Sequence, residues 1–289
     1  MKKLLSSLLL LSVSFTLNAA PVIEKAWETA AEFKLPESVI YDDSNNVLYV
    51  SNMQDSPFTK DGNGFISKIG TDGTIIELEW VTGLNAPKGL TISDGNLYIA
   101  DVDQLIVVEI ATGKILSSHH AFGAGFLNDV TADAIGNVYV SDMFNDTIYR
   151  LNKLGQLTVW LYSPDLLSPN GLHVEGNELI VGCWGFPMDG FATEEPGHLK
   201  TVSLATKEIK SLGNGKPVGN LDGVEPDGKD AYYATDWVAG KLLHIKKDGS
   251  FEVLLELTQG TADHEVILKD KLIVIPNMVE GKVLGFNIK

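Results

Sequence analysis

The chain has 289 residues, of which 44% are hydrophobic and 21% are charged, and its formal net charge is −16. Its only cysteine is Cys183, so an intramolecular disulfide is excluded. It has a single arginine, Arg150, and no basic cluster, so nucleic acid and anionic membrane surfaces are unsuitable partners and divalent cations are suitable ones.

The first residues have the features of a secretory signal peptide. Lys2 and Lys3 give a basic start, and residues 4–17 are apolar but too few to span a bilayer comfortably. The small residues of TLNAAP favour cleavage after Ala19. We therefore expect residues 1–19 to be a signal peptide and residues 20–289 to form a single domain that is periplasmic or secreted.

Six similar strand patterns follow in chain order: NVLYVSN (46–52), NLYIAD (96–101), NVYVSD (137–142), NELIVGC (177–183), AYYATD (231–236) and KLIVIPN (271–277). Each is preceded by a shorter apolar run and followed by a third strand, and in most units a turn leads to a fourth. Units of four short strands, repeated about every 40–50 residues, are typical of propeller blades. The sequence predicts an all-β, six-bladed β-propeller, since a two-sheet sandwich would not explain six equivalent units.

The two ends of the chain complement each other. The sixth unit lacks a fourth strand, whereas VIEKAWET (22–29) has no unit of its own. We expect this N-terminal segment to supply the missing outer strand and close the ring.

The residue before each first strand should point into one mouth of the central channel, because the first strands of all blades enter from the same face. These positions hold Glu37, Lys88, Asn128, Asn170, Asp222 and the pair Asp263–His264. Taken alone, Glu37 is better explained as an exposed turn residue, and Asn128–Asp129 and Asp222–Gly223 are common turn pairs. Their shared position in the repeat is what favours a site.

Four of these positions offer oxygen atoms: Glu37, Asn128, Asn170 and Asp222. Two carboxylates and two amide carbonyls form an all-oxygen ligand set with a formal charge of −2, which suits Ca²⁺ best. Mg²⁺, Mn²⁺ or Zn²⁺ could occupy the same ligands. Lys88 could bind a substrate carboxylate, stabilise an oxyanion, or form an ion pair with neighbouring acids.

The ends of the second strands should surround the same mouth. They hold Asn52–Met53, Asp101, Asp142–Met143, Trp184, Asp236–Trp237 and Asn277–Met278. Such walls suit a small organic substrate with an apolar body and one polar end. Trp184 and Trp237 are candidate substrate contacts, although packing between blades explains them equally well. Residues 51–64 and 183–197 are long loops that could form a lid.

The segments LPESV (35–39), NDVTADAIGNVYVSD (128–142), SPNGL (168–172) and LDGVEPDG (221–228) resemble the senescence marker protein/gluconolactonase (regucalcin-like) family, which is related to paraoxonases and diisopropyl fluorophosphatase. The resemblance covers essentially the whole mature chain. It implies a divalent cation held by Glu37, Asn170 and Asp222, with Asn128 as a fourth ligand or a substrate contact. It also implies that Asp222 polarises water or acts as a nucleophile.

Two further residues bear on the chemistry. Paraoxonase-like enzymes carry a histidine where this chain has Lys88, so a histidine-based mechanism of that kind is not expected. His264 is a second candidate base, because histidine titrates in the useful range, although a lone histidine at a turn more often has a structural role.

We predict a metal-dependent hydrolase acting on a lactone or ester, with Asp222, His264 and Lys88 as catalytic residues. Asn128, Lys88, Trp184 and Trp237 are the predicted substrate contacts. The alternative is a non-catalytic periplasmic propeller that binds a ligand or protein partner around a structural cation. We expect a monomer with a small-molecule substrate and with neither nucleic acid nor membrane as a partner.

Overall fold

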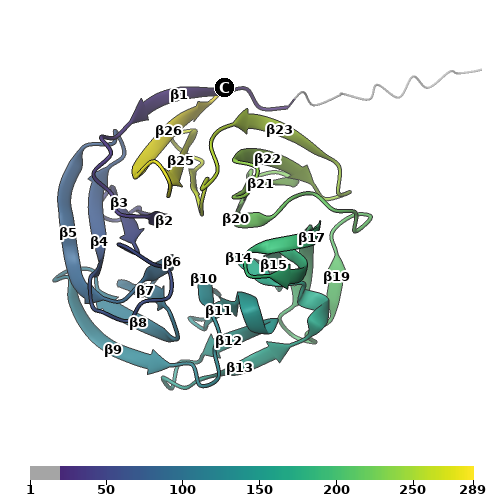
Figure 1. Ribbon diagram of the computed structural model, residues 1–289, viewed down its shortest axis with the longest axis horizontal. Helices are drawn as coiled ribbons and strands as arrows, with labels where there is room; N and C mark the ends of the chain where they lie inside the picture. The colour runs from purple at the N-terminus through teal and green to yellow at the C-terminus, as the bar shows by residue number, and fades with distance from the viewer. Residues whose placement is uncertain (1–19) are drawn as a thin grey trace, which may run out of the picture.

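Six four-stranded antiparallel sheets are arranged around a central axis (Figure 1). The structure is a computed structural model that describes residues 20–289, apart from the side chains of residues 187 and 188. The predicted signal peptide, residues 1–19, lies outside the described residues. The prediction of an all-β, six-bladed propeller is confirmed.

The strands of each of the first five blades run outward from the axis in chain order. The first blade consists of β2 (Pro36–Asp42), β3 (Val47–Asn52), β4 (Gly64–Gly70) and β5 (Ile75–Leu84), and the second of β6 (Pro87–Ser93), β7 (Asn96–Asp101), β8 (Gln104–Glu109) and β9 (Lys114–His120). The third consists of β10 (Leu127–Ala132), β11 (Val138–Asp142), β12 (Thr147–Leu151) and β13 (Leu157–Tyr162), and the fourth of β14 (Pro169–Glu175), β15 (Glu178–Cys183), β18 (Leu199–Ser203) and β19 (Ile209–Ser211). The fifth consists of β20 (Leu221–Pro226), β21 (Ala231–Asp236), β22 (Lys241–Lys246) and β23 (Phe251–Glu256). The fourth blade carries an inserted hairpin, β16 (Gly185–Asp189) and β17 (Ala192–Pro196).

The sixth blade is built from both ends of the chain. It contains β24 (Glu265–Ile267), β25 (Leu272–Asn277), β26 (Lys282–Ile288) and, as its outer strand, β1 (Ile23–Glu28). β1 pairs antiparallel with β26, from Ile23 opposite Ile288 to Glu28 opposite Leu284. The predicted closure of the ring by the N-terminal segment is confirmed.

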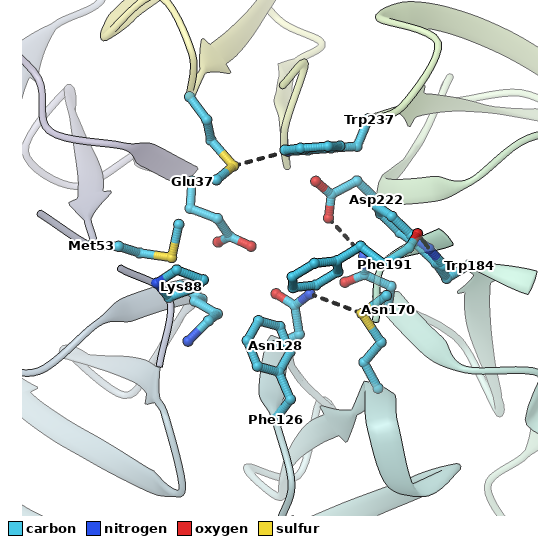
Figure 2. Close-up of a pocket in the computed structure, with 13 residues that line it drawn as sticks. Glu37, Met53, Lys88, Phe126, Asn128, Asn170, Trp184, Phe191, Asp222 and Trp237 are labelled. Carbon is cyan, nitrogen blue, oxygen red and sulfur yellow. Dashed lines mark hydrogen bonds between the residues drawn. The ribbon is translucent and has the colours of Figure 1, made fainter. Parts of the chain in front are cut away.

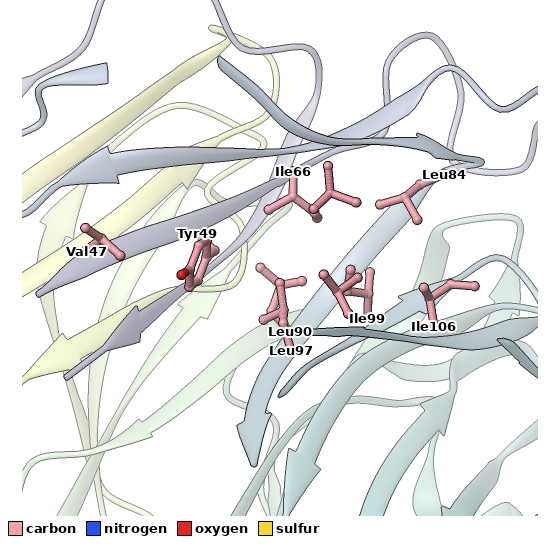
Figure 3. Close-up of a cluster of buried hydrophobic side chains, with 10 residues drawn as sticks. Val47, Tyr49, Ile66, Leu84, Leu90, Leu97, Ile99 and Ile106 are labelled. Atoms are coloured by element: carbon pink, nitrogen blue, oxygen red, sulfur yellow. The ribbon is translucent and has the colours of Figure 1, made fainter. Parts of the chain in front are cut away.

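The hydrophobic core consists of separate clusters between neighbouring blades (Figure 3). One of them joins Tyr49 and Ile66 of the first blade to Leu90, Leu97 and Ile99 of the second. Each fully buried side chain of this kind contributes roughly 1.5–3 kcal/mol. Because every blade is packed on both faces, the ring holds its inner strands, and the side chains at the axis, in fixed positions. No helix in the described part of the chain is long and apolar enough to cross a membrane.

Candidate functional site at the propeller axis

A cavity of about 230 Å³ lies at the centre of the ring (Figure 2). Five of the side chains predicted to meet at the channel mouth line it: Glu37, Lys88, Asn128, Asn170 and Asp222. They come from the inner strands of five different blades. The remaining lining residues are Met53, Pro57, Phe126, Met143, Trp184, Phe191, Trp237 and Met278.

A repeated β-bulge aims these five side chains. In each of the first five blades, the pairing of the first two strands shifts at the start of the inner strand, as between Leu127 and Val130 or between Leu221 and Val224. A bulge leaves one residue unpaired and re-aims its side chain. In the fifth blade, a threonine on the second strand stabilises the bulge, because Thr235 Oγ1 accepts the Gly223 N–H at 2.9 Å.

Asn170 and Gly171 lie within β14 and not in a hairpin turn. A Cβ on Gly171 would overlap the backbone oxygen of Asp222 in the neighbouring blade. Gly171 is therefore required by the close approach of two inner strands, which places Asn170 beside Asp222.

Three oxygen atoms at the axis are buried and have no hydrogen-bond partner among the described residues: Glu37 Oε2, Asn128 Oδ1 and Asn170 Oδ1. The contacts of the two amide nitrogens explain why the amide oxygens of Asn128 and Asn170 are left without partners. Asn170 Nδ2 donates to Asp222 Oδ1 at 2.9 Å, and Asn128 Nδ2 lies 3.9 Å from the Met143 sulfur. Buried polar atoms are rarely left without a partner, so these oxygens indicate a ligand that accepts electron pairs.

The donor set fits a hard divalent cation. Glu37 and Asp222 supply carboxylate oxygens, and Asn128 and Asn170 supply amide carbonyls, which are the ligands Ca²⁺ prefers. No group of three or more His, Cys, Asp or Glu side chains within the described residues is arranged to hold a metal ion. The axial set has only two carboxylates, so any cation here depends on the two amides.

Burial opposes charge on both carboxylates. It raises the pKa of Glu37 well above its usual value, with the nearby Asp222 adding to the rise and Lys88 opposing it. It also raises the pKa of Asp222 to about 7, although the hydrogen bond from Asn170 works in the opposite direction. Two buried acids at one axis resist ionisation together, and a cation between them would relieve this.

Lys88 is buried at the edge of the cavity. Its Nζ donates to the Ala86 carbonyl at 3.0 Å and lies 4.5 Å from the centre of the Phe126 ring. Burial lowers the pKa of Lys88 to about 8, against the attraction of Glu37 and Asp101. The ion pair considered from the sequence is not formed by Lys88 in the described part of the chain.

The expectation for the sixth blade is wrong by one residue. In the fifth blade Leu221 pairs with Asp236, and in the sixth blade Thr261 forms the equivalent bridge to Asn277. Ala262, the residue after Thr261, therefore corresponds to Asp222, the residue after Leu221. Ala262 is fully buried and offers no ligand. Asp263 and His264 follow it and lie deeper in the channel.

Asp263 and His264 line a second cavity, which they share with Asp129, Glu225 and Glu265. His264 is buried there with neither ring nitrogen hydrogen-bonded to any described residue, and burial lowers its pKa to about 4. His264 does not line the axial pocket, so the structure does not support the prediction that it serves as a base there.

The pocket walls are more apolar than expected. Met53, Met143, Trp184, Trp237 and Met278 line the pocket as predicted. Asp101 and the polar residues that were paired with these side chains in the prediction instead bind loop backbone: Asn52 accepts from Lys34 N, Asp101 from Ala86 N, Asp142 from Phe126 N, Asp236 from Ala239 N and Asn277 from Glu280 N. Successive residues of an extended strand end point in opposite directions, so only one of each pair faces the cavity.

Phe126, Pro57 and Phe191 were missed as lining residues. Pro57 and Phe191 belong to the two long loops, and Phe58 of the first loop lies 5.9 Å, between ring centres, from Phe191 of the inserted hairpin. Phe58 also lies 5.1 Å from Phe126. The two loops therefore meet through aromatic rings beside the pocket, and the aromatic residues within them were the available signal.

No family model and no curated protein matches the chain. Solved structures do. A gluconolactonase from Xanthomonas campestris, described as important in glucose secondary metabolic pathways, superposes with a TM-score of 0.69 at 13% identity, over 93% of this chain and 90% of that one. A catalytically inactive virginiamycin B lyase from Staphylococcus aureus, solved with quinupristin, superposes with a TM-score of 0.59 at 14% identity, over 88% of this chain and 95% of that one. These likenesses show that the chain has a propeller fold of the kind found in a gluconolactonase.

Proposed function

We propose that the protein is a divalent-cation-dependent hydrolase of a lactone or ester, with Ca²⁺ as its cation. One observation carries the proposal: three buried oxygens without partners among the described residues, on Glu37, Asn128 and Asn170, lie beside Asp222 in a pocket whose other walls are mostly apolar. The likeness to a gluconolactonase fold supports it. We also propose that the protein is exported and monomeric.

Glu37, Asn128, Asn170 and Asp222 would hold the cation. When bound, it would supply Lewis acidity toward the carbonyl oxygen of the substrate. We assign to Asp222, which lines the pocket, the role of accepting a proton from the attacking water. The water oxygen forms a bond to the carbonyl carbon, the C–O bond of the ester breaks, and the departing alcohol oxygen takes up the proton. The Lys88 ammonium stabilises the negative charge that develops on the carbonyl oxygen.

The test is an assay with sugar lactones, acyl-homoserine lactones and aryl esters, each with and without EDTA. Hydrolysis that EDTA abolishes and added Ca²⁺ restores supports the proposal. Calorimetry with Ca²⁺ provides the matched binding measurement, in which Asp222→Ala should abolish the heat of binding. Ca²⁺ binding without turnover of any substrate would favour the alternative, a non-catalytic propeller with a structural cation. Asp222 would then act only as a ligand, and no other carboxylate or histidine besides Glu37 lines the pocket within the described residues.

A further inference from the structure

The walls of the axial pocket have almost no free hydrogen-bonding capacity. Trp184 Nε1 donates to the Phe191 carbonyl at 3.0 Å, and Trp237 Nε1 is directed to the Met278 sulfur at 2.9 Å. Figure 2 shows the second of these contacts at the rim of the site. Both indole N–H groups, which would otherwise bind a polar ligand, are therefore already used within the protein.

The polar groups at the axis are also committed. The Asn170 amide N–H is used by Asp222, and the free oxygens of Glu37, Asn128 and Asn170 would be occupied by the cation. The side-chain donors then left among the described lining residues are Lys88 and the Asn128 amide nitrogen, whose contact is the Met143 sulfur at 3.9 Å. A ligand thus finds polar partners only near the axis, and thioether or aromatic surface everywhere else.

This distribution disfavours a sugar. A polyhydroxylated lactone would bury several hydroxyl groups against Met53, Phe126 and Trp237 without partners for them. Each buried hydroxyl without a hydrogen bond lowers affinity by roughly tenfold or more. A hydrocarbon chain or aryl ring at the same place gains affinity by leaving water.

The aromatic rings at the rim point to the same kind of ligand. Phe58 and Phe191 are 46% and 37% exposed in the free protein, although they contact each other and Phe126. An apolar group that enters between the loops and the axis would cover part of this surface. The cavity of about 230 Å³ is smaller than the roughly 300–1,000 Å³ typical of drug-sized ligands, so the ligand is compact.

We infer that the substrate is a small lactone or ester whose body is hydrocarbon, aliphatic or aryl, with its one polar end at the axis. That this ligand is hydrolysed rests on the proposed function. That the pocket binds a compact apolar ligand follows from its walls alone. The inferred substrate differs in class from the sugar lactone that the name of the structurally similar gluconolactonase indicates.

The test compares δ-nonalactone with glucono-δ-lactone on the Ca²⁺-loaded protein, using both hydrolysis and quenching of tryptophan fluorescence. We expect kcat/KM for δ-nonalactone to exceed that for glucono-δ-lactone by at least tenfold. Equal or higher kcat/KM for glucono-δ-lactone would overturn the inference while leaving the hydrolase proposal intact. Saturable quenching by δ-nonalactone alone, without turnover of either lactone, would support the apolar site. It would refute the hydrolase if acyl-homoserine lactones and aryl esters were not hydrolysed either.

Two variants extend the test. Phe191→Ser should raise KM for δ-nonalactone about fivefold or more, whereas Phe251→Ser, at a similarly exposed position (42%) on the outer strand β23, should not change it. Met53→Gln, which adds a polar group to the buried wall, should shift the ratio of kcat/KM toward glucono-δ-lactone by several-fold. An unchanged KM in Phe191→Ser together with an unchanged ratio in Met53→Gln would show that these walls do not contact the substrate.

Discussion

The two buried acids at the axis predict an unusual dependence of stability on pH and Ca²⁺. In the cation-free protein, burial raises the pKa of Asp222 from 3.8 to about 7. Between these values the folded protein keeps a proton that the unfolded chain has lost. Stability from this group is therefore complete below about pH 4 and is lost as the pH rises through about 7.

The magnitude follows from the same values. A rise from 3.8 to about 7, at about 1.4 kcal/mol for each pKa unit, corresponds to on the order of 4 kcal/mol. The raised pKa of Glu37 acts in the same direction. At 100 times its Kd, Ca²⁺ would return roughly 2.7 kcal/mol at pH 8, which corresponds to about 5–10 °C in Tm for a domain of this size. At pH 5 protons compete for the same oxygens, and the Ca²⁺ effect should be small.

The assay is thermal unfolding at pH 5 and pH 8, with EGTA or with excess Ca²⁺, for the unsubstituted protein, Asp222→Asn and Asp55→Asn. Asp55 is exposed on the 51–64 loop, so Asp55→Asn makes the same charge change away from the axis. We expect the Ca²⁺-induced rise in Tm at pH 8 in the unsubstituted protein and in Asp55→Asn, but not in Asp222→Asn. Asp222→Asn should also lose stability less steeply between pH 5 and pH 8 in EGTA. An equal Ca²⁺ effect in Asp222→Asn, or none in the unsubstituted protein, would refute the cation site.

Three further substitutions test the geometry. Lys88→Met should lower kcat/KM about 10–100-fold, because it removes the ammonium group that stabilises the developing negative charge alongside the metal ion. Steady-state kinetics at saturating Ca²⁺ will measure it, and unchanged kcat/KM would remove Lys88 from the mechanism. His264→Gln should leave kcat/KM unchanged, since His264 lines the other cavity, and a large loss of turnover in a folded variant would contradict this placement. Gly171→Ala should destabilise the protein by about 1–3 kcal/mol and weaken Ca²⁺ binding, because the added methyl overlaps the Asp222 backbone. Denaturant unfolding will measure the stability and calorimetry the Kd for Ca²⁺, and values within error of the unsubstituted protein would contradict the close approach.

The fold could be predicted from sequence because its signals are local and repeated. Alternating apolar residues and short turns define each strand, and six repetitions define the blades. The closure by residues 22–29 followed from counting strands. Five of the six axial positions followed from the same register, because a bulge occurs at the same place in the first five blades.

The rest of the site depends on geometry that the repeat does not encode. In the sixth blade the inner strand β24 is only three residues long, so the pattern TADHEV does not show that Ala262 occupies the axial position. At the second-strand ends, the sequence shows two adjacent candidates but not which one faces the cavity. Phe126 and Phe191 reach the pocket from loops, and the path of a loop depends on tertiary contacts.

The blade that supplies no ligand nevertheless helps to hold the site. The backbone N–H of Asp263 donates to the backbone carbonyl of Glu37 at 3.0 Å, so the sixth blade helps to hold the backbone of the first axial residue. That blade is itself completed by β1 from the other end of the chain. Asp222, on the other side of the sixth blade, belongs to the fifth. The spacing of the two axial carboxylates therefore depends on ring closure and on the packing of the blades that carry them.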